Sequence, residues 1–197
     1  MKSGENRTIK PLAIFCFIFF LTVSFLLPFF SFEGYSIISN TTSHLGAQGS
    51  PYAWIMNTVF MLLGIMAILH TVKARFLYTR IFGLIFGLSL VLTGVFQHAP
   101  LVESIQVNQL YDTLHSFFAT TTGFSFTLFA AGHAFMSRAA QRKAAIALTV
   151  IATAVPLIMF GIPSVMGITQ RFMFIAAFYW LFFYYRDEDG TKSMTQG

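Results

Sequence analysis

The sequence predicts an all-α, multi-pass integral membrane protein, a six-transmembrane-helix bundle with both termini in the cytoplasm. The first reason is composition, because the 197 residues are 56% hydrophobic and only 10% charged, which is too apolar for an ordinary soluble domain. The second is that the apolar residues form six runs close to the roughly 20 residues that cross a bilayer core. The third is that basic residues gather in alternate connections between these runs.

The six predicted helices make up one domain, residues 11–185, between a cytoplasmic segment at 1–10 and a cytoplasmic tail at 186–197. Basic residues also precede signal peptides, but the first run is long and ends in aromatic residues rather than at a small-residue cleavage site. We therefore expect it to be a retained helix. The predicted spans are 11–32, 52–72, 78–97, 114–136, 144–161 and 170–185.

Charge sets the predicted orientation. Alternating connections place all of the 12 Lys and Arg residues on one side, except Arg171. The positive-inside rule makes that side cytoplasmic, and the expected location is the plasma (cell inner) membrane. The net charge of +5 does not indicate nucleic-acid binding, because the basic residues lie between apolar runs and not along one solvated face. The single cysteine, Cys16, lies in the first run, so no disulfide framework or thiol metal site is expected.

Small residues recur at helical spacing on the third and fourth predicted helices. Small side chains let membrane helices approach closely, so both stripes are expected to be packing faces within the bundle. A homodimer interface is the alternative, and the oligomeric state and any protein partner stay open. The stripes are Gly83, Gly87 and Gly94 on the third helix, and Ser116, Thr120, Gly123, Thr127 and Ala131 on the fourth.

Ionisable residues other than Lys and Arg gather on the predicted outer side, where the connections 33–51 and 98–112 are longest. Asp112 and His115 are spaced i, i+3 and share one face of the fourth helix. Asp112 also suits the positive end of that helix dipole, so a capping role is the alternative. The predicted ligand-binding residues are Ser43, His44, Asn57, His98, Asp112, His115 and Arg171.

Three classes of function fit this pattern. The first is a non-enzymatic protein that binds a membrane lipid, a small ligand or a partner protein through a polar outer vestibule bounded by Arg171 and the 33–51 connection. The second is a membrane-embedded, metal-dependent lipid hydrolase with His98, Asp112 and His115 as catalytic candidates and His44 nearby. The third is a small permease or channel, which the scarcity of charges at membrane depth disfavours.

No cofactor is expected, with zinc and heme as alternatives. Zinc can be held by two histidines and a carboxylate with an open position for water, and His98, His115 and Asp112 are the candidate ligands. A diheme arrangement needs paired imidazoles. The candidate pairs are His70 with His133 and His98 with His115. His44 either belongs to this outer cluster or is a solvated loop residue.

Three segments carry a resemblance to a known family. The sequence "ISNTTSHLGAQGSPYAWIMNTVFMLLG", with "LTGVF" ending the third helix and "LHSFF" near the start of the fourth, resembles the DUF998 family of six-helix membrane proteins, over residues 12–185. Its most specific part is the Ser-x-Leu-Gly segment at 43–46, with Pro51 and Asn57 downstream. The chain departs from the expected family pattern in three places. His44 stands where an acidic residue is expected, and Gln97 and His98 stand where a proline and an acidic residue are expected. Gln170 stands where a glutamate is expected. The resemblance implies the fold and no activity.

Overall fold

The computed structural model describes residues 5–186, and within that range the regular structure is entirely helical. Each predicted span falls on a long helix. The predicted tail at 186–197 lies outside the described residues except for Arg186. The α-helices are α1 (Glu5–Leu26), α2 (Thr42–Leu45), α3 (Ala53–Thr71), α4 (Leu77–Val95), α5 (Gln109–Met136), α6 (Ala139–Gly161) and α7 (Met166–Tyr179), with 3-10 turns at Leu27–Phe30 and Pro163–Val165 and a π-helical turn at Trp180–Tyr184.

Within residues 5–186, five helical segments are long and apolar enough to cross a membrane. The chain is therefore a multi-pass integral membrane protein. The predicted fourth span lies within α5, which has 28 residues but a more polar composition that includes Thr120, Thr121 and Thr122. That α5 makes a sixth crossing stays a prediction. The five segments are Ile9–Phe30, Ala53–Thr71, Leu77–Val95, Ala140–Gly161 and Pro163–Tyr184.

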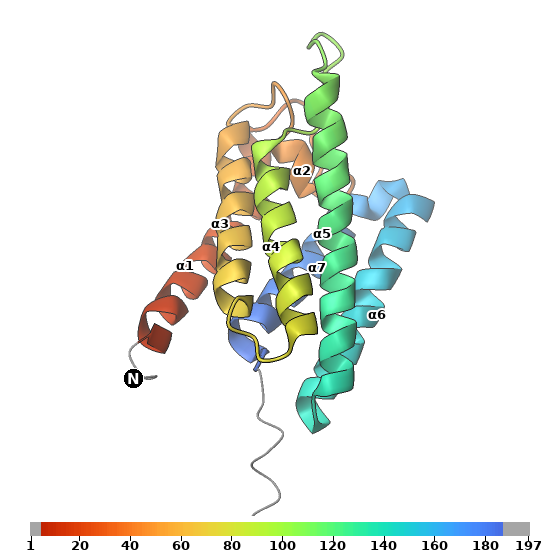
Figure 1. Cartoon of the computed structure of the whole chain (residues 1–197). Helices are drawn as coiled ribbons and strands as arrows, with labels where there is room; N and C mark the ends of the chain where they lie inside the picture. The colour runs from red at the N-terminus through yellow and green to blue at the C-terminus, as the bar shows by residue number, and fades with distance from the viewer. Residues whose placement is uncertain (1–4, 187–197) are drawn as a thin grey trace, which may run out of the picture.

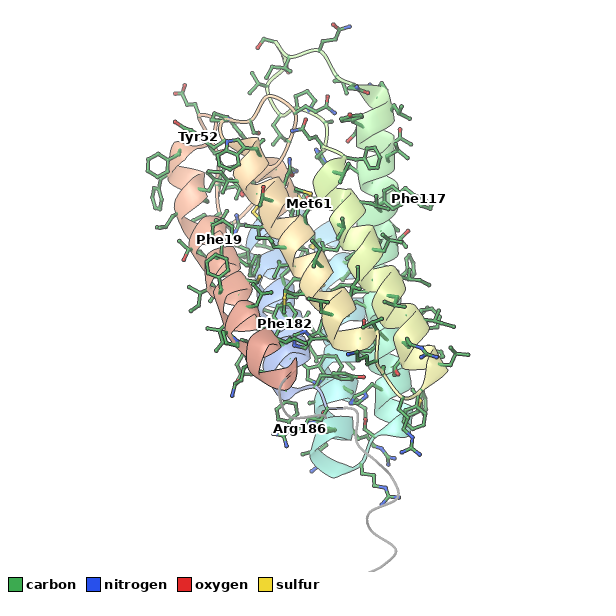
Figure 2. The ribbon with its side chains drawn as sticks, turned by 60° about the vertical axis from the view of Figure 1, so that its left-hand side comes forward. Phe19, Tyr52, Met61, Phe117, Phe182 and Arg186 are labelled. Atoms are coloured by element: carbon green, nitrogen blue, oxygen red, sulfur yellow. The ribbon has the colours of Figure 1, made fainter. Side chains whose placement is uncertain are left out.

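The helices run up and down the bundle. Figure 1 shows α3, α4 and α5 side by side, with α1 beside α3, α7 behind α4, and α6 beside α5. The α3–α4 and α5–α6 connections lie at one end, which we call the inner end after its predicted side. The connections at 31–52 and 96–108 lie at the opposite, outer end together with α2. Figure 2 shows Tyr52 at the outer end and Arg186 at the inner end.

The predicted packing face on α4 is confirmed. A Cβ atom added to Gly64 of α3 would come within 2.5 Å of the Gly87 carbonyl oxygen, and one added to Gly87 would come within 2.7 Å of the Gly64 carbonyl oxygen. One added to Gly94 would lie 2.6 Å from the carbonyl oxygen of Asn57. The backbones of α3 and α4 therefore touch, as small residues allow in membrane helices.

The predicted packing face on α5 is wrong. Ser116 and Thr120 are exposed, and a Cβ atom added to Gly123 would meet nothing within 4 Å. The helix instead turns bulky rings inward: Phe126 packs against Phe86 with ring centroids 5.1 Å apart, and Phe126 and Phe129 both contact Trp180. Aromatic burial removes more apolar area than small residues do, and it decides which face of α5 is inside.

Candidate functional site

The two outer connections fold over the end of the bundle and are joined by the side chain of Gln48. We call residues 31–52 and 96–108 together the roof. The Gln48 amide nitrogen donates to the carbonyl oxygens of Gln97 (3.2 Å) and Asn108 (3.1 Å), and its oxygen accepts from the Asn108 backbone N–H (2.8 Å). Its own backbone N–H donates to the carbonyl oxygen of His98 (2.9 Å). A single buried amide therefore holds both halves of the roof in register.

Arg171 is fully buried, with 0% of its surface exposed, rather than bordering an open vestibule. Each of its three guanidinium nitrogens donates to protein groups. A cation at this depth is stabilised here by carbonyl dipoles, which fix the roof to α1 and α7. The acceptors are the carbonyl oxygens of Ser24 (3.2 Å), Ile37 (3.0 Å), Asn40 (2.8 Å) and Gly167 (3.0 Å), and the Tyr35 hydroxyl (2.6 Å).

Three of the predicted site residues come together where the roof meets α5: His44 and His98 of the roof and His115 of α5. The ring centroids of His44 and His98 are 5.1 Å apart, and those of His98 and His115 are 5.4 Å apart, both in edge-to-face contact. The backbone N–H of Thr41 donates to Nδ1 of His44 (3.2 Å), so this neutral ring carries its proton on Nε2. The other two rings bond carbonyl oxygens through Nδ1 and therefore carry a proton there.

His44 is a buried neutral imidazole and not a solvated loop residue. Only 7% of its surface is exposed. Burial lowers the pKa of His44 to about 4, and the electrostatic effects of the neighbouring His98, Arg171 and His115 act in the same direction. At neutral pH this ring is therefore uncharged. A local contact holds the ring in place, because Nδ1 accepts the Thr41 N–H and so caps α2.

Asp112 is bound across the roof. Its Oδ1 accepts from the backbone N–H of Ala99 at 2.7 Å, whereas the N-cap of α5 is Asn108, whose side chain accepts from the Tyr111 N–H. Among residues 5–186, no three His, Cys, Asp or Glu side chains are placed to share a metal ion. The rings of His98 and His115 contact each other edge to face, and heme stays an alternative of the sequence prediction.

Asn57 connects α3 to the roof. Its Nδ2 donates to the carbonyl oxygen of Gly46 at 3.1 Å, and its Oδ1 is buried without a partner among the described residues. A Cβ atom on Gly46 would collide with Oδ1 of Asn57, although the φ of Gly46 is an ordinary −92°. Close approach, and not an unusual turn, therefore explains glycine at position 46.

A cavity of about 570 Å³ lies below the roof, between α3, α4, α5, α6 and α7. Its lining consists mainly of Phe, Leu, Met and Ala side chains, and no charged residue belongs to it. Ser43 of the roof and Gln170 of α7 contribute polar groups. Of the predicted site residues, Ser43 is the one that lines this cavity, and the histidines lie above it: Nδ1 of His115 donates to the carbonyl of Thr93, another lining residue.

The cavity opens sideways, between α5 and α6. Figure 1 shows these two helices close together at the inner end and separating toward the outer end. The exposed residues of the lining all belong to this pair. They are Thr120 and Phe124 on α5, and Thr153, Pro156 and Leu157 on α6. The opening therefore lies along apolar helices and faces the surroundings of the bundle.

Sequence reasoning missed three residues that organise this region: Thr42, Gln48 and Gln170. Oε1 of Gln170 accepts from both the backbone N–H (2.9 Å) and the hydroxyl (2.7 Å) of Thr42, 128 positions away. The sequence signal that could have found them is the amide side chains of Gln48 and Gln170 in a strongly apolar chain. Buried amides need hydrogen-bond partners, so each of these side chains indicates a contact.

Comparison with known proteins supports the family resemblance. The family described as "Protein of unknown function (DUF998)" matches residues 13–186, which is nearly the whole chain. No curated protein and no solved structure matches the chain.

Proposed function

Because the chain belongs to the DUF998 family, which is of unknown function, the geometry of the site has to indicate an activity, and we propose that the protein binds a lipid inside its helical bundle. The observation that carries this proposal is the apolar cavity of about 570 Å³ beneath the roof. That volume falls within the roughly 300–1,000 Å³ typical of small-molecule sites. The binding site is thus deeper than the polar outer vestibule that the sequence predicts.

The chemistry of the lining supports an apolar ligand. The side chains of Phe60, Phe86 and Phe178 form much of the wall, and they offer dispersion contacts and no hydrogen bonds. An alkyl chain placed there exchanges contacts with membrane lipid for contacts with the protein. A polar solute would lose its hydration without replacement, which costs free energy.

The position of the opening supports entry from the membrane. The roof covers the outer end of the bundle, held by Gln48 and by the bonds of Arg171. The gap between α5 and α6 instead carries Phe124 and Leu157, which are 68% and 67% exposed. A ligand that enters along these side chains stays in an apolar environment throughout.

The geometry gives less support to the metal-dependent hydrolase. Oδ1 of Asp112 is bound to the Ala99 N–H, and the Nδ1 atoms of the histidines bond the backbone. These groups are suited to holding the roof closed. Binding, and not hydrolysis, is therefore the function that we propose.

Gly123 allows a direct test. It lines the cavity, and an added Cβ atom would meet nothing within 4 Å, so Gly123→Leu places a bulky side chain there without a clash at its Cβ atom. Detergent-purified protein is extracted with organic solvent, and the lipid retained per mole of protein is measured by mass spectrometry. We expect wild type to retain a defined lipid and Gly123→Leu to lose most of it.

The matched control is Gly161→Leu. Gly161 also has nothing within 4 Å of an added Cβ atom, but it lies at the end of α6 and does not line the cavity. This variant should retain lipid at the wild-type level. Equal retention by wild type and Gly123→Leu would refute binding in the cavity.

A further inference from the structure

From the hydrogen bonds at the outer end of the cavity, we infer that the ligand is a neutral lipid whose uncharged head group presents oxygen acceptors, such as a glycerol ester, and is not an anionic phospholipid or a fatty acid. This inference rests on the proposed lipid binding and specifies the ligand class. Three observations carry it: the orientation of the Gln170 amide, a Ser43 hydroxyl with no hydrogen bond to the described residues, and the absence of charged residues from the described lining.

The orientation of the Gln170 amide is fixed by Thr42. A backbone N–H can only donate, so the amide atom that it bonds at 2.9 Å must be the oxygen. The Thr42 hydroxyl donates to the same oxygen at 2.7 Å. The amide nitrogen, with its two N–H donors, is therefore the end of the group that Thr42 does not bond. Gln170 itself lines the cavity, and we infer that these donors are presented to the ligand.

The other polar groups of the lining divide into engaged and available ones. Most of the threonines donate to carbonyls of their own helices and so offer a ligand no proton. The engaged pairs are Thr93 with Ser89 (2.9 Å), Thr122 with Phe118 (2.8 Å), Thr127 with Gly123 (2.9 Å) and Thr153 with Thr149 (2.8 Å). Ser43 makes no such bond within residues 5–186, and its position next to Thr42 places a second donor at the same outer end.

Within residues 5–186, no positively charged side chain lines the cavity. The nearest cation in sequence, Arg171, follows Gln170 directly but donates to carbonyls and to the Tyr35 hydroxyl and is absent from the lining. An ionised carboxylate or phosphate moved into an apolar site without a partner loses far more free energy than a neutral ester does. The donors of Ser43 and Gln170 therefore match an uncharged acceptor.

The test compares head groups on one alkyl chain. Four photoactivatable probes share a diazirine-bearing chain and end in a glycerol ester, a carboxylate, a phosphate or an ammonium group. Purified wild-type protein is irradiated with each probe, and covalent labelling is quantified by mass spectrometry. We expect the glycerol ester to label at least about tenfold more strongly than the carboxylate or the phosphate.

The decisive variant is Gln170→Glu. The new side chain keeps an oxygen for both Thr42 donors but replaces the amide donors by a carboxylate oxygen. Labelling by the glycerol ester should fall about five- to tenfold, which corresponds to the loss of about one hydrogen bond. Labelling by the ammonium probe should rise, a gain that a folding defect does not produce. Gln106→Glu adds the same charge to an exposed position of the roof and should change neither probe.

The outcomes separate the two proposals. Equal labelling by all four probes in wild type, abolished by Gly123→Leu, would overturn the inferred head-group class while leaving lipid binding in place. Preference for the phosphate or carboxylate probe would overturn it as well. If no probe labels the wild-type protein more strongly than it labels Gly123→Leu, lipid binding itself is refuted, and the inferred head-group class is refuted with it.

Discussion

The α3–α4 pair and the α5–α6 pair use glycine in opposite ways. Between α3 and α4, Gly64 and Gly87 face each other so closely that neither position has room for a Cβ atom. On α5, Gly123 faces open space, and α5 and α6 separate toward the outer end. The α3–α4 pair is in direct backbone contact, whereas the α5–α6 pair encloses part of the cavity. A glycine in a membrane helix therefore indicates close packing only where a neighbouring helix lies directly opposite.

The largest predicted effect is at the tightly packed pair. In Gly87→Leu, the new side chain meets the Gly64 carbonyl and the Ile68 backbone, neither of which can move without shifting a helix. We expect the free energy of unfolding to fall by about 3 kcal/mol or more, at the upper end of overpacking costs. Denaturant unfolding in detergent, followed by circular dichroism, measures this. Stability equal to wild type would show that α3 and α4 are not in backbone contact.

A pH dependence should arise in the roof, where His44 is buried. The pKa of His44 is lowered from 6.5 to about 4 in the folded state, so the unfolded state binds more protons between these values. The contribution of the neutral His44 to the free energy of unfolding is therefore fully present above pH ~6.5. It is lost as the pH falls toward 4, by up to about 3 kcal/mol.

The matched variant for this prediction is His44→Asn. Its side-chain oxygen can accept the Thr41 N–H in place of Nδ1, but it does not titrate. Unfolding measured from pH 7.5 to 4.5 should show a smaller loss of stability in this variant. An unchanged pH profile would assign the dependence to other groups.

A smaller loss of stability is expected in the roof, with no change in the lipid bound in the cavity. The Tyr35 hydroxyl accepts from Arg171 at 2.6 Å and donates to the carbonyl of Thr41 at 2.8 Å. Tyr35→Phe should lower the free energy of unfolding by about 2 kcal/mol, since the bond involves a charged donor. The retained lipid should stay at the wild-type level. Tyr52→Phe, at an exposed position of the roof, is the control and should change neither quantity.

The smallest stability effect belongs to the open helix pair. Gly123→Leu should change the free energy of unfolding by less than about 1 kcal/mol and toward higher stability, because glycine costs about 0.5–1 kcal/mol in a helix interior. Unfolding curves for this variant and Gly87→Leu, recorded together, compare the two pairs directly. A loss as large as that of Gly87→Leu would remove the contrast between them.

The helices and their approximate ends could be predicted from the sequence, because apolar length and composition act locally. The packing face of α4 was predictable for the same reason, since Gly83, Gly87 and Gly94 repeat at helical spacing. The pairing of His98 with His115 was a candidate from the sequence, whereas the sequence left open whether His44 joins them or is a solvated loop residue.

The remaining features depend on contacts between distant segments. Gln170 bonds Thr42 across 128 positions, and no local pattern pairs them. Arg171 is predictable as an unusual cation, but its partners are backbone carbonyls, which every residue carries. The cavity depends on the angle between α5 and α6, and sequence spacing does not encode that angle.

The most direct test of lipid binding is the position at which a bound chain reacts. The glycerol-ester probe, with its diazirine near the chain end, is irradiated with wild-type protein, and the labelled residues are located by peptide mass spectrometry. If the lipid occupies the cavity, adducts form on buried lining residues such as Phe126 and Phe178, which are 4% and 1% exposed, and excess unlabelled ester abolishes them. Adducts confined to outward-facing residues such as Phe135 and Phe160, which are 85% and 90% exposed, would contradict binding in the cavity.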